Sequence, residues 1–395
     1  MHQIFHFVDP DSTHADRLRE AIQQFTLVLD LELPEDELRQ SMADARAVLA
    51  PVLTEAGDGS DGTLHAFGHG HLDVAWLWPI ADTERKVART LANQLALIDD
   101  AKHHWGLDHK FLQPQPHTYW MLENTYPELF ERTKQAIADG NIIADGAVWV
   151  EPDTNVSSGE SLIRQFLFGK RYFKDVLGVD SEVLWLPDVF GYCAALPQIM
   201  RGCGVKYLST WKIYWNYHGG DDFPHHLFNW EGIDGSKVLV ELITMYGNDG
   251  DPKATIDNWK CRRTRDANVD SRIYAFGHSD GGGGPDLKHT AFIARQKNLK
   301  GAPKFEYTTL KEHFDYIDAK GEPKDTYVGE LYFQAHRGVL TSQAKTKMFN
   351  RKCELALREA ECWSALAGEK FAFPLETMTD AWRTVLLNQF HDILP

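Results

Sequence analysis

Residues 69–79 read HGHLDVAWLWP, and this stretch places two potential metal ligands, His71 and Asp73, two positions apart beside two tryptophans. Side chains at positions i and i+2 of an extended segment point the same way, so the two can converge on one cation. Residues 64–67 are largely apolar and predict a buried strand just before them. The ligands would lie at its carboxyl end, where α/β barrels place their active sites. The two residues could instead only pair with each other, so other segments must decide.

A second strand-like run, residues 183–186, is followed by Pro187 and Asp188 and then by a turn at Gly191. A carboxylate at the end of a strand and beside aromatic residues can act as a metal ligand or as a nucleophile. The same pattern is also typical of an aspartate that caps a turn after a proline. Both interpretations stay open for this segment alone.

A third run, residues 273–276, leads through His278 and Ser279 to Asp280, which is followed by four glycines and a proline. A loop this rich in glycine is costly in backbone entropy, so we expect it to serve a close approach of backbone to a ligand. Phosphate binding is the competing interpretation. It is disfavoured because no Gly-Lys-Ser/Thr sequence follows and the dinucleotide-binding spacing is absent.

The fourth segment is residues 386–395, LLNQFHDILP, which predicts a helix that closes on the pair His391 and Asp392. Together the four segments resemble glycoside hydrolase family 38, the zinc-dependent retaining α-mannosidases. The resemblance runs over roughly residues 60–395 with the motifs in family order, and most resembles the cytosolic, vacuolar and bacterial branch. Further matching motifs are GAVWVEPD (146–153), SGES (158–161), GELY (329–332), HRG (336–338), TSQ (341–343) and NR (350–351).

This resemblance implies a zinc site formed by His71, Asp73, Asp188 and His391. Two imidazoles and two carboxylates, with no thiolate, suit a Zn²⁺ ion that must also accept sugar hydroxyls. In the family the ion acts mainly as a template and Lewis acid for the mannose ring. The sequence leaves open whether Co²⁺ or another divalent ion can replace it.

The resemblance also implies that Asp188 is the catalytic nucleophile as well as a ligand. Retaining hydrolysis needs a second carboxyl group about 5–5.5 Å away that protonates the departing oxygen. Asp280 occupies the position of the family's G-D-G-G-G-G-P acid, and we expect burial and its negative neighbour to favour the protonated form. The branch has a glycine immediately before this aspartate, whereas this chain has Ser279 preceded by His278.

Several further residues match the family's sugar-binding positions. Trp76 corresponds to the aromatic residue on which the mannose ring stacks, and a buried core tryptophan is the less favoured alternative. Asp392 corresponds to the acid that hydrogen-bonds mannose hydroxyls. Weaker candidates for the pocket wall are Trp149, Glu151, Asp153, Tyr332 and Arg337.

Composition is consistent with a large enzyme acting on a neutral ligand. The 395 residues exceed one typical domain and fit a barrel of about 250 residues plus additional helices. With 41 basic and 57 acidic residues, the net charge is −16, and no Lys/Arg run predicts a nucleic-acid surface. We therefore expect an α-mannoside or oligosaccharide substrate and no nucleic-acid partner. Assembly of the full-length protein into a homo-oligomer is compatible with the sequence but not indicated by it.

Five cysteines without a C-x-x-C pair argue against a disulfide framework. No apolar stretch reaches the roughly 18 residues needed to span a membrane, and the N-terminus does not resemble a secretory signal. We therefore expect a reduced, cytoplasmic protein with no membrane attachment.

The pattern along the chain predicts three regions: a helical region and linker (1–60), a catalytic α/β domain (61–325) and part of a helical bundle (326–395). Strand-like runs alternate with helical stretches in the middle region, which predicts a parallel sheet. The resemblance makes this a distorted parallel (β/α)7-type barrel followed by the start of a three-helix bundle. Since the family continues into further bundle and β-sandwich domains, we expect a fragment or an unusually short member.

Three functional hypotheses remain at this point. The first is a zinc α-mannosidase that forms a covalent mannosyl intermediate on Asp188. The second is a metal-dependent deacetylase or amidohydrolase, which can also use an H-x-D element but would attack through metal-bound water. The third is a fragment that binds mannose without turning it over.

Overall fold

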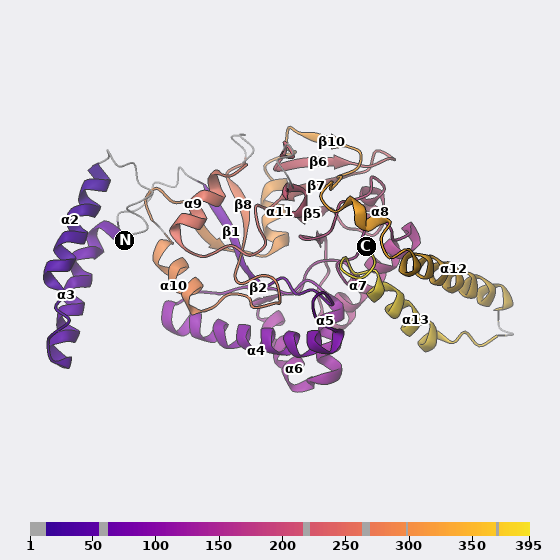
Figure 1. Cartoon of the computed structure of the whole chain (residues 1–395), viewed down its shortest axis with the longest axis horizontal. Helices are drawn as coiled ribbons and strands as arrows, with labels where there is room; N and C mark the ends of the chain where they lie inside the picture. Colours follow the sequence, from indigo (N-terminus) through magenta and orange to yellow (C-terminus); the bar gives the residue numbers. More distant parts are fainter. Residues whose placement is uncertain (1–12, 55–61, 216–221, 263–268, 298, 369–370) are drawn as a thin grey trace.

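The computed structural model describes residues 13–54, 62–215, 222–262, 269–297, 299–368 and 371–395. A mixed α/β body forms the middle of the molecule, and a pair of helices projects from it on either side (Figure 1). The first pair is α2 (Thr13–Val28) and α3 (Glu35–Leu53), as expected for the N-terminal region. The predicted linker after them falls mainly on residues 55–61, outside the described residues.

Strand β1 (Thr63–His69) is the centre of the first sheet. Strand β8 (Ser271–Phe276) pairs with one edge of β1. The other edge is shared, because β9 (Lys304–Tyr307) pairs with the first half of β1 and β2 (Phe111–Leu112) pairs with its end. Strand β3 (Ile142–Ile143) lies beyond β2, and all these pairings are parallel.

The second sheet has the strand order β10-β6-β7-β5-β4. Its pairings are parallel except that β6 and β7 run antiparallel. In chain order its strands are β4 (Val183–Trp185), β5 (Tyr207–Thr210), β6 (Leu227–Glu231), β7 (Lys237–Leu242) and β10 (Thr326–Val328).

The parallel sheet and its covering helices are confirmed, but the predicted distorted (β/α)7-type barrel is not, because no barrel is closed in the described part of the chain. Within the described residues the strands form two separate hydrogen-bonded sheets, one of which contains an antiparallel pair. The antiparallel pair follows from the short turn at residues 232–236, since parallel neighbours need a crossover of about a dozen residues or more. Beyond β3 the chain is irregular, because this strand ends at Ile143 and Ala147 adopts a positive φ of 66° that no regular strand accommodates.

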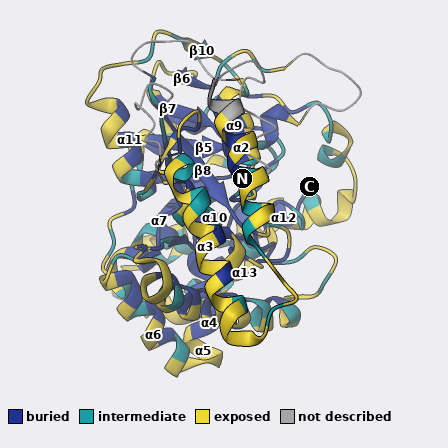
Figure 2. Cartoon of the chain, turned by 90° about the vertical axis from the view of Figure 1, so that its left-hand side faces the viewer, coloured by how far each residue is buried: buried dark blue, intermediate teal, exposed yellow. Residues whose placement is uncertain are grey.

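The helices lie around the two sheets, with their exposed faces outward and the strands buried (Figure 2). None of the helices in the described residues combines the length and apolar character needed to cross a lipid bilayer. In chain order the helices after α3 are α4 (Ile80–Trp105), α5 (Pro116–Thr125), α6 (Pro127–Ala138), α7 (Gly159–Leu177), α8 (Leu196–Gly202), η1 (Lys212–Tyr214), α9 (Pro252–Lys260), α10 (Leu287–Gln296), α11 (Leu310–Asp318), η2 (Arg337–Leu340), α12 (Ala344–Ala367) and α13 (Leu375–Asn388).

A packed apolar interior lies between the two sheets. The rings of Phe67 from β1 and Trp185 from β4 meet edge to face with centroids 5.7 Å apart. Side chains from both sheets, including Leu112 and Leu239, complete the same buried cluster. The two sheets therefore face each other across a filled core, with the carboxyl ends of β1 and β4 close together.

Helix α7 supports the irregular segment that follows β3. Gly169 of α7 lies so close to this segment that an added Cβ would be 2.5 Å from the carbonyl oxygen of Ala147. We expect Gly169→Ala to lower the free energy of unfolding by about 1–3 kcal/mol, because the helix must move away from the segment. Gly202→Ala, at the end of α8, is the control, since a Cβ there has no described atom within 4 Å. Equal stability of the two variants, measured by denaturant unfolding, would contradict this packing.

Candidate active site and metal centre

The candidate site lies where three segments meet at one end of the α/β body. His71 and Asp73 follow the carboxyl end of β1, Asp188 follows β4, and His391 follows α13. One potential ligand atom from each of these residues lies within 4.8 Å of the others. The structure thus brings together the four residues that the sequence singled out as metal ligands.

Asp73 is at the centre of this cluster. Its Oδ1 atom is 3.0 Å from Nε2 of His71 and 3.3 Å from Nε2 of His391. Both Nε2 atoms are 4.0 Å from Oδ2 of Asp188. His71 and Asp73 therefore do pair with each other, but within a larger group of four residues.

Glu151 lies next to the Nδ1 atoms of both histidines, on the side of each ring that faces away from the cluster. Its backbone carbonyl is 2.9 Å from Nδ1 of His391, and its carboxylate Oε2 is 3.7 Å from Nδ1 of His71. A carbonyl oxygen can only accept, so Nδ1 of His391 carries a hydrogen, and in the neutral ring Nε2 keeps its lone pair toward the cluster. Donation of the second ring nitrogen to an oxygen is typical of metal-ligating histidines.

The segment that contains Glu151 also fixes His391 through backbone contacts. The backbone N–H of His391 donates to the Glu151 carbonyl at 3.2 Å, and that of Asp153 donates to the Gln389 carbonyl at 2.8 Å. Pro152 and Phe390 form an antiparallel bridge between these contacts. The end of α13 is therefore joined to the α/β body directly beside the cluster.

The donor set fits a divalent cation. Nε2 of His391 is buried and has no hydrogen-bond partner among the described residues, although it faces two carboxylates. Burial disfavours a charged imidazole, yet the carboxylates of Asp73 and Glu151 raise the pKa of His71 well above its usual value. For His391, burial is likewise outweighed, mainly by the neighbouring carboxylate of Asp73, which raises its pKa to about 9. The surroundings thus favour positive charge at this point, which a cation would supply.

Lys212, from η1, contacts the opposite side of Asp188. Its Nζ donates to Oδ1 of Asp188 at 2.6 Å and lies 4.3 Å from the ring centre of Trp215. Lys212 is itself buried. Oδ1 of Asp188 is thereby engaged by the ammonium group, while Oδ2 faces the two imidazoles.

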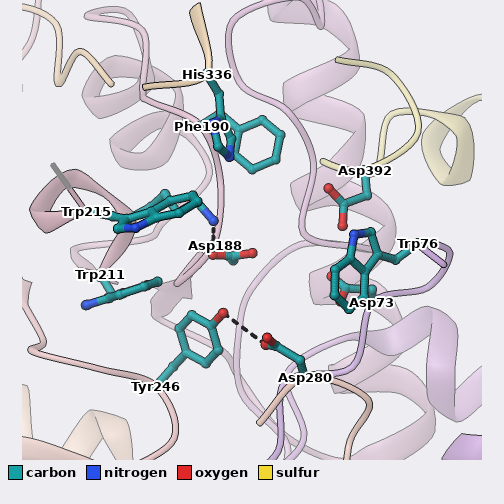
Figure 3. Close-up of a pocket in the computed structure, with 11 residues that line it drawn as sticks. Asp73, Trp76, Asp188, Phe190, Trp211, Trp215, Tyr246, Asp280, His336 and Asp392 are labelled. Atoms are coloured by element: carbon teal, nitrogen blue, oxygen red, sulfur yellow. Dashed lines mark hydrogen bonds and ion pairs between the residues drawn. The ribbon is translucent and has the colours of Figure 1, made fainter. Parts of the chain in front are cut away.

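A pocket of about 360 Å³ opens over this cluster, within the size range of ligand pockets. Trp76 and Asp392 form one side of it, and Trp211 and Trp215 lie opposite (Figure 3). The full lining is Asp73, Trp76, Asp188, Phe190, Trp211, Lys212, Trp215, Tyr246, Asp280, His336 and Asp392.

Asp280 lies at the edge of this pocket and accepts a hydrogen bond from the Tyr246 hydroxyl at 3.0 Å (Figure 3). The expectation that Asp280 would be buried is wrong, because its side chain is exposed. The glycine loop does allow a close approach of backbone, as expected. What it approaches is the backbone of the His71 segment and not the space for a ligand. The backbone N–H groups of Gly281 and Gly282 donate to the His71 carbonyl at 3.0 and 2.8 Å.

The remaining candidates from the sequence differ in whether they line the pocket. Trp76, 47% exposed, and Asp392, whose pKa burial raises to about 6, both line the pocket. Trp149 instead lies in the core against His117 and Tyr172, and Tyr332 is exposed outside the pocket lining. The weaker candidates also lie outside the lining: Glu151 is behind the histidines, Asp153 accepts the backbone N–H groups of Asn155 and Val156, and Arg337 is exposed.

Sequence reasoning missed Lys212 and the aromatic residues Trp211, Trp215 and Tyr246. A signal for two of them was present, because Trp211 and Lys212 directly follow β5, just as Asp188 closely follows β4. The rule that functional residues follow the carboxyl ends of parallel strands could have found them. Tyr246 lies four residues after β7 and gives a weaker signal.

The sequence matches two family descriptions. Residues 61–332 match "Glycosyl hydrolases family 38 N-terminal domain", and residues 334–395 match "Alpha mannosidase middle domain". The chain belongs to glycosyl hydrolase family 38. Family 38 members named as α-mannosidases are among the similar proteins, which agrees with the resemblance drawn from the motifs.

Human "Alpha-mannosidase 2C1" is 36% identical over 89% of this chain and 33% of its own length. "Alpha-mannosidase G" of Dictyostelium discoideum is 39% identical over 84% of this chain and 30% of its own length. The chain thus spans about a third of the length of these curated relatives. A solved α-mannosidase from Enterococcus faecalis V583 has the same fold, with a TM-score of 0.71 at 22% identity, over 84% of this chain and 39% of that one.

The position of Glu151 predicts a measurable effect on metal binding. Glu151→Gln keeps the carbonyl that holds His391 but removes the negative charge facing His71. We expect the affinity for Zn²⁺ to fall by about 10- to 100-fold, measured by competition with a chromophoric chelator. Glu359→Gln, an exposed position on α12, is the matched control. Unchanged affinity in Glu151→Gln would show that this residue does not orient the histidine.

Proposed function

We propose that this chain carries the active site of a zinc-dependent retaining α-mannosidase. It would release terminal non-reducing α-D-mannose from mannosides and N-glycan-type oligosaccharides through a covalent mannosyl-aspartate intermediate. The observation that carries the proposal is the convergence of His71, Asp73, Asp188 and His391 beneath a pocket of sugar size. Membership of family 38 and the α-mannosidase relatives support the same substrate class.

The four clustered residues would hold the cation. When bound, Zn²⁺ would act as a template and Lewis acid for hydroxyls of the mannose ring. The two imidazoles are already oriented for this by Glu151, as their Nδ1 atoms point away from the cluster. Co²⁺ has the same ligand preferences and is an alternative ion for this set.

Asp188 is the proposed nucleophile. Lys212 fixes the rotation of its carboxylate by donating to Oδ1. An oxygen of Asp188 would form a bond to the anomeric carbon while the bond from that carbon to the departing oxygen breaks. Retention then requires a second displacement, in which water replaces Asp188 at the same carbon.

Asp280 is the proposed acid and base for these two steps. It would give a proton to the departing oxygen and later take one from the attacking water. Its exposed position at the edge of the pocket suits this role, because the leaving group and the water both arrive from solvent. The Tyr246 hydroxyl holds the carboxyl group in place.

Trp76 and Asp392 are the proposed sugar contacts on the opposite side of the pocket. The C–H face of a sugar packs well on an aromatic surface, and Trp76 is exposed enough to offer one. Asp392 would accept hydrogen bonds from sugar hydroxyls. For Trp149 and Tyr332, placed in the core and outside the pocket lining, we propose no substrate contact.

We also propose a reducing, cytoplasmic location and a division between catalytic and helical regions near residues 325–334. The free state of all five cysteines supports the first proposal. The junction of the two family matches, between residues 332 and 334, supports the second.

The first test is hydrolysis of an aryl α-mannoside beside the matching α-glucoside. We expect the wild-type chain to cleave only the mannoside, to lose activity on chelation and to regain it with Zn²⁺. Asp188→Ala should lower kcat on the order of 10⁴-fold or more, whereas Asp175→Ala, an exposed aspartate on α7, should leave it unchanged. Wild-type turnover that persists in Asp188→Ala would rule out this nucleophile.

Azide separates a protein nucleophile from attack by metal-bound water, as in a deacetylase or amidohydrolase. Asp188→Gly with azide and an activated α-mannoside should form the β-mannosyl azide, because azide enters the space left by the carboxylate. An enzyme using metal-bound water would give no such product. The wild-type enzyme should release the α-anomer first, detected by NMR, and initial release of the β-anomer would contradict retention.

The role of Asp280 predicts a dependence on the leaving group. Asp280→Asn should slow cleavage of a methyl α-mannoside far more than that of a dinitrophenyl α-mannoside, which needs no protonation of its leaving group. Tyr246→Phe, which removes only the hydrogen bond to Asp280, should show the same trend more weakly. An equal loss on both substrates would assign Asp280 a binding or structural role instead.

A further inference from the structure

A second group of potential metal ligands lies on the far side of the glycine loop. His278 precedes the loop, while Asp286 and His289 follow it at the start of α10. One ligand atom from each lies within 4.8 Å of the others. Nε2 of His278 is 3.3 Å from Oδ2 of Asp286, and Nδ1 of His289 is 2.6 Å from Oδ1.

His289 is oriented like a metal-ligating histidine. It is buried, and its Nδ1 faces Asp286 while its Nε2 faces the Asp249 carboxylate at 3.8 Å. In the metal-free chain a hydrogen on Nδ1 donates to Oδ1 of Asp286; a cation would take the place of that hydrogen, and the Asp249 carboxylate would then favour the hydrogen on Nε2. The same arrangement holds His71, whose second ring nitrogen faces Glu151.

Capping of α10 accounts for only part of this group. Asp286 is the N-cap residue, and its Oδ1 accepts the backbone N–H of His289 at 3.1 Å. This leaves Oδ2 facing His278, whose ring takes no part in the cap and is 66% exposed. Oδ2 of Asp286, Nε2 of His278 and Nδ1 of His289 are thus three ligand atoms directed at one another.

The group is open to solvent and separate from the active-site pocket. His278 and Asp286 line a cavity of about 410 Å³ that shares no lining residue with that pocket in the described chain. Asp100 and Lys288 line the same cavity, which with Asp286 gives its lining two acidic residues and one basic residue. An ion could therefore reach the cluster without passing the substrate site.

We propose that His278, Asp286 and His289 form a second divalent-cation site, specific for borderline transition ions such as Zn²⁺ or Co²⁺. Two imidazoles and one carboxylate favour such ions over Mg²⁺ or Ca²⁺, which prefer all-oxygen sites. Water would complete the coordination. Because the site has three protein ligands, two of them exposed, its affinity is lower than that of the buried four-residue cluster.

A cation here would tie together both ends of the loop that presents Asp280. His278 and Gly284 already exchange backbone hydrogen bonds at 3.0 and 2.8 Å, which close the base of the loop. Asp280 is two residues after His278, on the side of the active-site pocket. The ion would add a link from this base to helix α10, so its occupancy would stiffen the support of Asp280.

The test is a titration of the metal-free 395-residue chain with Zn²⁺ by calorimetry, and with Co²⁺ by its visible absorption. We expect two ions per wild-type chain, one tight and one weaker. His278→Gln should remove only the weaker ion, and Asp73→Asn should weaken only the tight one. His104→Gln, an exposed histidine at the end of α4, should keep both.

Asp249→Asn provides a graded check, because it leaves all three ligands in place. We expect it to weaken only the second ion, by about 10-fold or more. A single bound ion in the wild type, or two unchanged ions in His278→Gln, would overturn the proposal. These readouts do not require mannosidase activity, so a failure of the proposed function would be seen separately.

Discussion

The close contact between the glycine loop and the segment of His71 is the constraint on which the site depends. A Cβ on Gly70 would lie 2.6 Å from the backbone nitrogen of Gly284, so two bare stretches of backbone must lie against each other. Gly281 and Gly282 then both donate to the same carbonyl, that of His71. One contact thereby positions the first candidate metal ligands and the proposed proton donor, Asp280, relative to one another.

Charge is the second organising factor. Asp73, Glu151, Asp188 and Asp392 lie around two imidazoles. Burial, together with the neighbouring carboxylates, raises the pKa of Glu151 to about 7 although the histidines oppose this. So much negative charge in a buried place is costly unless cations or protons balance it. Lys212 balances part of this negative charge at Oδ1 of Asp188, and the histidines lie next to the remaining carboxylates. The same charges that would destabilise an empty site would make it bind a divalent ion tightly.

Much of this could be predicted from the sequence, because the informative residues lie next to strong local patterns. Strands β1, β4 and β8 lie on the runs expected as strands, residues 64–67, 183–186 and 273–276, since each is a clear run of strand formers that ends at turn or polar residues. The four clustered residues were found through motifs at strand and helix ends. The antiparallel β6–β7 pair was not foreseen, because strand direction depends on the length of a connecting turn and not on the strands themselves. Trp149, a candidate for the pocket wall, lies in the core for a related reason: a large aromatic residue within a motif can face the core or the pocket, and only packing decides.

The fourth candidate ligand, His391, comes from the region matched as a middle domain, whereas the other three come from the region matched as the family 38 N-terminal domain. Asp188 and His391 are more than two hundred residues apart in sequence. Any ion that binds all four residues therefore joins two distant parts of the chain. By thermodynamic linkage, the free energy of ion binding adds to that of docking the helices α12 and α13 onto the α/β body. A metal ion bound in this way would also stabilise the contact between the two regions. Its removal would weaken their docking as well as abolish the reaction.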